Sequence, residues 1–302
     1  MFYSPLRYPG GKNRLANFIA KICVDNKIDG HYIEPYAGGA SVALYLLFNS
    51  IVKEITINDK DRAIYAFWHS VLDYSNELCA LIYKTSISIN NWKLQREIQK
   101  NKKHADLLEL GFSTLFLNRT NISGIINGGV MGGLEQRGSY KIDCRFNKDD
   151  IIKKIQNISE KKNRIRLYNK DAIKLIDKIQ QESLSNNIIF YLDPPYFLKG
   201  SSLYLNYYKT DDHSAVCEKI KQIKNIHWII SYDNVPEIKR LYSLYNKKEY
   251  SLTHTAHKSK LGKEILFFSD ELIVPRNINP ITYKMISSSL VVKSHSLMER
   301  TV

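Results

Sequence analysis

The apolar run Ile188–Leu192 stands directly before Asp193-Pro194-Pro195-Tyr196. An apolar run of this length without polar alternation is typical of a strand buried on both faces, as in a parallel sheet. The two prolines end the strand sharply, because proline lacks a backbone donor and keeps the preceding residue out of helical geometry. Ligands of open α/β sheets bind at the carboxyl ends of the strands, so we expect a binding site here.

The residues after this strand suit one chemical task, the alkylation of an amino group on a planar ring. The Asp193 carboxylate and the Pro194 carbonyl can accept hydrogen bonds from an exocyclic amine of adenine or cytosine and localise its lone pair. The Tyr196 ring can stack on the base, an interaction worth about 1–3 kcal/mol. We therefore predict Asp193, Pro194 and Tyr196 as catalytic residues. The alternative is a proline turn that merely ends a strand.

Strand-like and helical segments alternate along much of the chain, which indicates an α/β protein with a doubly wound sheet. The expected strands are His31–Glu34, Glu54–Asn58, Ile165–Tyr168, Ile188–Leu192, His227–Ser231 and Ile265–Phe268. Helical spacing is seen in Ala40–Phe48, in the repeat of Ile151, Ile155 and Ile158, and in that of Val216, Ile220 and Ile223.

The interval 64–159 does not alternate in this way. It is mainly helical up to Asn118 and then becomes rich in glycine and arginine. We expect an inserted, mainly helical target-recognition domain, between the two parts, 1–63 and 160–275, of a discontinuous catalytic domain. Residues 276–302 would form a polar C-terminal tail.

The chain of 302 residues carries a formal net charge of +14, with 44 Lys and Arg against 30 Asp and Glu. Such a balance favours a polyanionic partner, although an AT-rich coding sequence also explains the abundance of lysine and tyrosine. The four cysteines are far apart and form no metal-binding pair, so no metal is expected. Without a signal peptide or a membrane-length apolar run, a cytoplasmic protein that does not enter membranes is expected.

A second candidate site follows the first expected strand, where His31–Glu34 leads into Pro35-Tyr36-Ala37-Gly38-Gly39-Ala40 and a helix. Glycines at such a turn let the backbone approach a ligand closely. Asp59 follows the second strand, where a carboxylate can accept from both hydroxyls of a ribose. Glu34, Gly38 and Asp59 are therefore predicted to bind a nucleoside cofactor, a pattern that by itself also fits NAD.

Two further segments favour S-adenosylmethionine. Tyr8 can stack on an adenine and Lys12 can pair with a cofactor carboxylate, whereas a phosphate loop is disfavoured because no strand precedes Gly10-Gly11-Lys12. Asp171 follows the third strand and can accept from the adenine amine. It can equally cap the helix that begins near Ala172.

Taken in order, Arg7–Lys12, Glu34–Ala40 with Asp59, and Asp193–Tyr196 resemble the Dam-type, D12 class, DNA adenine-N6 methyltransferases, from Ser4 to about Ser269. The resemblance implies methyl transfer from S-adenosylmethionine to N6 of an adenine flipped out of double-stranded DNA. It implies that Tyr8, Lys12, Asp59 and Asp193 contact the cofactor, and that Asp193, Pro194 and Tyr196 grip the adenine.

The resemblance also implies where DNA binds. Leu117-Asn118-Arg119 is similar to the start of the family's base-reading region, and an arginine fork matches O6 and N7 of guanine. A phosphate contact or a structural ion pair is the alternative for Arg119. The expected DNA-binding residues are Asn118, Arg119, Arg137 and, in a basic hairpin near the C-terminus, Lys258 and Lys260.

Two departures from the family pattern stand out. Ala40 replaces the last glycine of the cofactor turn, and 122–145 is unlike the recognition loop of GATC-specific members, so GATC is only one possible target. The alternative functions are methylation of cytosine N4 in DNA, methylation of RNA, and DNA binding by a regulator without catalytic activity. A monomer or weak dimer, with a cognate restriction endonuclease as a possible partner, is expected.

Overall fold

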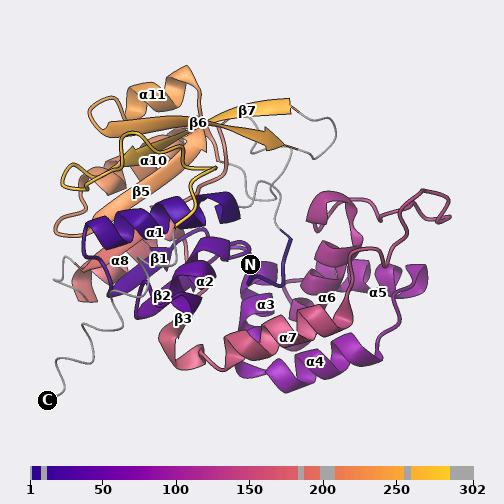
Figure 1. Ribbon diagram of the computed structural model, residues 1–302. Coiled ribbons are helices and arrows are strands. Elements are labelled where there is room, and N and C mark those ends of the chain that lie inside the picture. The colour runs from indigo at the N-terminus through magenta and orange to yellow at the C-terminus, as the bar shows by residue number, and fades with distance from the viewer. Residues whose placement is uncertain (1, 8–11, 183–186, 198–207, 255–259, 286–302) are drawn as a thin grey trace, which may run out of the picture.

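The computed structural model describes residues 2–7, 12–182, 187–197, 208–254 and 260–285, with the side chains of 252–254, 260 and 261 left out. Its centre is a seven-stranded sheet in the order β3-β2-β1-β4-β5-β7-β6 (Figure 1). The five strands from β3 to β5 run parallel, and β7 and β6 are antiparallel additions at one edge. The predicted α/β class with a doubly wound sheet is confirmed.

Four predicted strands have the bounds expected from sequence: β1 (His31–Glu34), β2 (Glu54–Asn58), β3 (Ile165–Tyr168) and β4 (Ile188–Leu192). β5 (His227–Asp233) extends two residues beyond its prediction, and β7 (Lys260–Phe268) begins five residues earlier than expected. β6 (Asn246–His254) was missed, because it begins with four consecutive polar residues, Asn246 to Glu249, and contains no apolar run.

Helices cover both faces of the sheet, and alternate residues of each strand point into two separate cores. Ile189 and Tyr191 of β4 belong to the core that contains α1 (Ala16–Asp25) and α2 (Ser41–Phe48). Ile188, Phe190 and Leu192 belong to the core that contains α8 (Ala172–Glu182), α10 (Thr210–Lys221) and α11 (Pro236–Leu241). β4 is therefore buried on both sides, as its uninterrupted apolar sequence predicts.

Between β2 and β3 the chain forms a group of helices that extends to one side of the sheet (Figure 1). These are α3 (Arg62–Asp73), α4 (Ser75–Lys84), α5 (Ile89–Lys100), α6 (Leu107–Thr120) and α7 (Lys148–Ser159). A segment with little regular structure, apart from the short 3-10 helix η2 (Ile122–Gly124), separates α6 from α7. The helices α4 to α7 lie within the interval 64–159, which was expected to form the inserted domain, and α3 begins two residues before that interval.

Candidate active site

The site lies where the winding of the sheet changes direction. β1 continues to β2 on one side, while β4 lies on its other side and continues to β5, so the carboxyl ends of β1 and β4 are neighbours. This switch point is where open α/β sheets bind ligands. Glu34 ends β1 and Asp193 follows β4. The fold therefore brings together two residues that were predicted separately.

Asp193 is held by polar groups from two strands. Its Oδ1 accepts a 2.6 Å hydrogen bond from the Ser231 hydroxyl of β5 and lies 3.4 Å from Nζ of Lys12. The Asp193 side chain keeps 25% of its surface exposed, so a ligand can reach it. Burial raises the pKa of Asp193, whereas Lys12 and Ser231 act in the opposite direction.

Lys12 and Tyr196 are both buried beside this carboxylate. Nζ of Lys12 donates to the Tyr196 hydroxyl and lies 4.8 Å from the centroid of its ring. Lys12 comes from the 3-10 helix η1 (Lys12–Leu15), near the N-terminus of the chain, and reaches a residue that follows β4. Pro194 lies between Asp193 and Tyr196 and is also buried. The structure thus assembles Lys12 with all three residues that were predicted to be catalytic.

Glu34 lies at the start of the cofactor turn and is 4% exposed. Its Oε1 accepts from the Tyr32 hydroxyl at 2.9 Å and from the backbone N–H of Ala43, in the first turn of α2, at 3.0 Å. Burial raises the pKa of Glu34 to about 8, against these two hydrogen bonds. Ala40, at the last position of the turn, takes left-handed geometry with φ 46°, a conformation that glycine adopts at a lower cost than alanine.

Asp59 follows β2 and is fixed by backbone donors on both oxygens. The N–H of Gly38 donates to Oδ2 at 3.0 Å and the N–H of Asp61 donates to Oδ1 at 2.9 Å. Burial raises the pKa of Asp59 to about 7 even though these two bonds favour the ionised form. Gly38 has a φ of 45°, so this close approach of the turn to Asp59 relies on left-handed backbone.

Asn58, just before Asp59, ties three strand ends together. Its Nδ2 donates to the carbonyls of Pro35 and Lys170, and its Oδ1 accepts from the N–H of Lys170. Because Asn58 is fully buried, these bonds hold the ends of β1, β2 and β3 in a fixed relation. Sequence reasoning passed over Asn58, although a buried asparagine at the end of an apolar strand is itself an indication of such a role.

Asp171 has the geometry of a helix cap. Its Oδ1 accepts from the N–H of Ile173 in the first turn of α8, and its Oδ2 pairs with Lys60 at 3.0 Å. Tyr36 and Tyr208, which were not predicted, lie nearby and their hydroxyls are 3.0 Å apart. Asp171 contributes to the raised pKa of both phenols, after burial as the main cause. The contact of Asp171 with a cofactor stays a prediction.

Asn118 of α6 joins the helical insertion between β2 and β3 to the N-terminal segment. Its Oδ1 accepts from the N–H of Arg7 at 2.7 Å, and its Nδ2 donates to the carbonyls of Arg7 and Gly124, both at 2.8 Å. A Cβ on Gly124 would lie 2.3 Å from the Arg7 carbonyl oxygen, so only glycine allows this approach. Asn118 is 1% exposed, and its geometry is that of a structural tie; its predicted DNA contact finds no support in this arrangement.

Arg119 is 8% exposed, yet within the described part of the chain few of its five donors have a partner. Among the described residues, its Nη1 makes one long bond of 3.5 Å to the Arg145 carbonyl and its buried Nε has no partner. Burial, followed by the neighbouring charge of Arg7, lowers the pKa of Arg119 to about 10. A buried guanidinium with unused donors is suited to an anionic or carbonyl acceptor from a ligand.

The glycine-rich segment between α6 and α7 has a defined, irregular path. The Gln136 side chain donates to the Met131 carbonyl at 2.7 Å and accepts from the N–H of Ile142 at 2.8 Å, so it holds the two ends of a loop together. Arg137, next to it, is exposed. Three predicted residues cannot be placed: Tyr8 and Lys258 lie outside the described residues, and the side chain of Lys260 does too.

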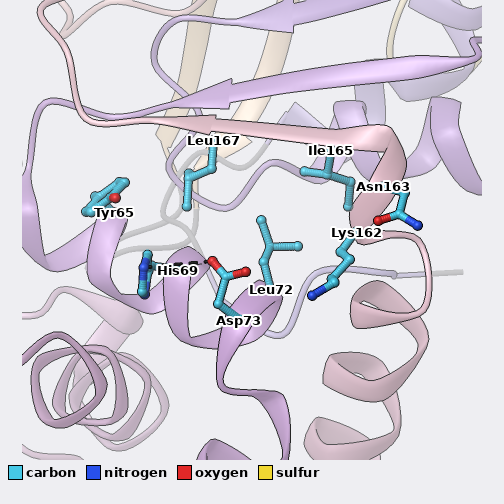
Figure 2. A pocket seen from close by; sticks show the side chains of 8 residues that line it. All are labelled: Tyr65, His69, Leu72, Asp73, Lys162, Asn163, Ile165 and Leu167. Carbon is cyan, nitrogen blue, oxygen red and sulfur yellow. Dashed lines mark ion pairs between the residues drawn. The ribbon is translucent and has the colours of Figure 1, made fainter.

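A separate hollow of about 440 Å³ lies between α3 and the beginning of β3. Figure 2 shows the side chains that line it. Tyr65, His69 and Asp73 line one side, and Lys162 and Asn163 line the other. None of the predicted site residues that the structure describes belongs to this hollow. Its lining is shared between polar side chains and the apolar Leu72, Ile165 and Leu167, and it lies apart from Asp193.

Two features are absent from the described part of the chain. No helix in it combines the length and the apolar composition that a membrane crossing requires. No group of three or more histidine, cysteine, aspartate or glutamate side chains in it is arranged to hold a metal ion.

The doubly wound sheet, with carboxylates at the end of β1 and directly after β2 and β4, defines a Rossmann-like protein with a binding site at the carboxyl edge of its strands. The family model of the D12 class N6 adenine-specific DNA methyltransferases matches residues 8–258. The chain belongs to this family, as its motifs predicted, and it is an enzyme that methylates adenine in DNA. Membership implies S-adenosylmethionine as the methyl donor.

Similar proteins include one relative in sequence and two solved structures. The Type II methyltransferase M.MjaIII of Methanocaldococcus jannaschii is 25% identical over 224 residues, which cover 68% of this chain and 73% of M.MjaIII. Among solved structures, a proposed RNA methyltransferase from Pyrococcus horikoshii is 12% identical, with a TM-score of 0.40 over 87% of this chain and 85% of that one. The rRNA methyltransferase AviRa of Streptomyces viridochromogenes is 9% identical, with a TM-score of 0.33 over 83% of this chain and 82% of its own.

Proposed function

We propose that the enzyme extrudes its target adenine from the duplex and holds it between Asp193, Pro194 and Tyr196 for direct methyl transfer to N6. The observation that carries this proposal is the part-exposed Asp193 carboxylate at the switch point, next to the Tyr196 ring. In this role the Asp193 carboxylate and the Pro194 carbonyl accept hydrogen bonds from the two N–H groups of the adenine amino group. Tyr196 contributes a stacking face to the base.

The residues around β1 and β2 fit a nucleoside cofactor. The carboxylates of the buried Glu34 and the half-buried Asp59 stand at adjacent strand ends, and both have raised pKa values because loss of solvent penalises their charge. Hydroxyl donors of a ribose would offset that penalty. We assign the cofactor to Glu34, Gly38 and Asp59, with Tyr8 and Asp171 at its adenine and Lys12 and Asp193 near the reacting end.

When bound, S-adenosylmethionine supplies an electrophilic methyl group on a sulfonium. Asp193 orients the acceptor nitrogen and stabilises the positive charge that grows on it as the N–C bond forms. The raised pKa of Asp193 also makes its carboxylate a better acceptor for the proton that N6 releases than an ordinary aspartate. Lys12 and Ser231 fix the position of the carboxylate through Oδ1.

DNA recognition is assigned to the inserted domain 64–159 between the two parts of the catalytic domain, 1–63 and 160–275. Arg119 is the first candidate for a base contact, because its buried Nε has no partner within the described residues. Arg137, Lys258 and Lys260 are assigned to the phosphates, where cations give affinity that depends on salt. A monomer or weak dimer and a cognate endonuclease remain part of this proposal, as does a cytoplasmic setting.

Base extrusion is tested by comparing duplexes that differ only in the base opposite the target adenine. We expect the enzyme to bind a mismatched duplex about 10-fold more tightly than the paired one. Breaking a base pair costs a few kcal/mol, and a mismatched adenine has less pairing energy to lose when it is extruded. Equal affinities would count against extrusion. Digestion of the methylated product and mass analysis of its nucleosides then separate N6-methyladenine from N4-methylcytosine. RNA, the remaining alternative substrate, is tested as a competitor of DNA in the methylation assay.

The role of Asp59 predicts how cofactor affinity depends on pH. Ribose hydroxyls donate to the ionised carboxylate, so cofactor binding requires the proton to leave Asp59. With a free-protein pKa of about 7, the affinity should fall as the pH falls, by about 10-fold between pH 8 and pH 6. Calorimetric titration of the purified enzyme with S-adenosylmethionine measures this change.

The matched variant is Asp59→Asn, which cannot ionise. It should bind more weakly and lose the part of the pH dependence that is centred near pH 7. Glu34, whose pKa is raised to about 8, and the cofactor's own groups titrate in both proteins, so the difference between the two curves isolates Asp59. Parallel curves for the two proteins would remove Asp59 from the cofactor site.

A further inference from the structure

Glu264 is a buried carboxylate at the point where β7 becomes apolar. It is 1% exposed and precedes Ile265–Phe268, which are all buried. In the sheet it pairs with Tyr250 of β6 on one side and with Asp233 of β5 on the other. A buried carboxylate is costly unless it has charged or hydrogen-bonding partners. No role in the proposed function explains why this strand carries one.

The partners of Glu264 connect it to the active site. Its Oε1 accepts a 2.6 Å bond from the Tyr196 hydroxyl, and its Oε2 accepts from the Tyr250 hydroxyl at 2.6 Å and from Nζ of Lys12 at 2.9 Å. Tyr196 and Lys12 belong to the proposed site, whereas Tyr250 does not. One carboxylate therefore fixes two site residues that lie 184 positions apart in the sequence.

Lys12 stands between two carboxylates and is held more closely by Glu264. Its Nζ lies 2.9 Å from Oε2 of Glu264 and 3.4 Å from Oδ1 of Asp193. Burial alone would raise the pKa of Glu264, but Lys12 and the two phenols lower it below its usual value. Glu264 is thus the ionised partner that keeps the ammonium group compensated.

The Lys12 ammonium also lies close to where a substrate amino group has to bind. It is near Asp193 and 4.8 Å from the centroid of the Tyr196 ring, the two groups assigned to the adenine. If Lys12 lost Glu264, Asp193 would be the remaining carboxylate among its described ion-pair partners. The ammonium would then compete with the target nitrogen for the same carboxylate.

We propose that Glu264 is a positioning residue of the methyl transfer: it holds the Lys12 ammonium and the Tyr196 hydroxyl so that the Asp193 carboxylate stays available to the amino group of the substrate. The inference rests on the proposed roles of Asp193 and Tyr196. It assigns to Glu264 no contact with the adenine or with the cofactor.

Glu264→Gln and Tyr250→Phe form the matched pair that tests it. Both remove one interaction from the same carboxylate cluster, but only the first removes the charge. Glu264→Gln should lower kcat by about 10- to 100-fold, the effect expected for a lost charged hydrogen-bond partner. Its KM for DNA should stay within about 3-fold, and Tyr250→Phe should keep kcat within about 3-fold. Equal losses in the two variants would reduce Glu264 to a packing role.

The pH profile separates positioning from a general loss of structure. Glu264 contributes to the raised pKa of Asp193, so Glu264→Gln should move the acidic limb of kcat to lower pH. The groups that face Asp193 electrostatically are Lys12, Glu34, Tyr191, Tyr196, Tyr250 and Glu264. Tyr250→Phe leaves all the carboxylates in place and should leave this limb unmoved. An unmoved limb in Glu264→Gln contradicts the proposal.

A double-mutant cycle with Lys12→Met keeps the test decisive if Glu264→Gln folds poorly, because the double variant removes both buried charges. In single-turnover assays, Lys12→Met/Glu264→Gln should be no slower than Lys12→Met by more than about 2-fold. A further 10-fold loss would mean that Glu264 acts by another route. Asp193→Ala separates a failure of this inference from a failure of the proposed function. If Asp193→Ala is inactive while Glu264→Gln is fully active, the proposed role of Asp193 stands and only the positioning role of Glu264 is wrong.

Discussion

Asp193→Ala should abolish methylation, with a loss in kcat of about 1,000-fold or more, while DNA binding stays within about 3-fold of the native value. The variant loses the acceptor for the amino group and one of the two carboxylates beside Lys12, but no cation that contacts phosphates. Transfer of a radiolabelled methyl group to DNA and a binding assay at fixed salt measure the two properties on the same preparation.

Ser231→Ala provides a graded control for this experiment. It leaves the Asp193 carboxylate in place and removes the 2.6 Å bond that fixes Oδ1. We expect about a 10-fold loss in kcat, since a hydrogen bond to a charged group is lost without removing the group itself. Substantial turnover by Asp193→Ala would overturn the assigned mechanism, whatever the result for Ser231→Ala.

Arg119→Ala should relax sequence discrimination at one base pair by about 10- to 100-fold, the range of a bidentate arginine–guanine contact. The reason is structural: the guanidinium is buried, and among the described residues it makes one weak bond, to the Arg145 carbonyl, and has a buried Nε without a partner. Modified-base sequencing of a plasmid library treated with each protein gives the discrimination at every position of the site.

Arg119→Lys is the informative partner of this variant, because lysine keeps the charge but lacks the planar fork. If Arg119 reads guanine, both variants lose discrimination at the same position. If it binds a phosphate, Arg119→Lys retains affinity, while Arg119→Ala weakens binding to all sequences and lowers the salt slope by about one. That second pattern would contradict a base contact.

Much of the fold could be predicted because its central strands have a strong local signal. β1, β2, β3 and β4 were bounded correctly from runs of apolar and β-branched residues between turns. β6 was not predicted because an edge strand that carries lysines has the same local sequence pattern as an exposed loop. Its strand conformation depends on pairing with β7, a later segment of the chain. The early start of β7 has the same cause.

Some residues of the candidate site could be predicted from the sequence, and others became evident only in the structure. Residues in short motifs were predicted, and the structure brings Lys12, Asp193 and Tyr196 into contact. Glu264 and Ser231 could not be found in this way, because each is a single polar residue in a strand and becomes significant only when that strand lies next to β4 or beneath Tyr196. A lone glutamate before Ile265–Phe268 was nevertheless a visible irregularity.

Asn118 shows how a motif can mislead about a role. It belongs to the segment that resembles the base-reading region, but its amide is bonded to the backbone of Arg7 and Gly124. Sequence spacing indicates that a residue matters at such a position. It does not indicate whether the side chain points outward to a ligand or inward to the protein's own backbone.

The bond between Asn118 and Arg7 has a consequence for any attempt to change the target of this enzyme. Lys12 follows Arg7 by five residues, and Arg7 is bonded to Asn118 of α6, the helix at the start of the proposed DNA-reading region. The position of the proposed active-site lysine is therefore linked to that helix through the chain. A chimaera that takes its helical insertion from a relative must therefore import the matching start of the chain as well. Otherwise the graft would change the sequence that is read and also disturb the chemistry.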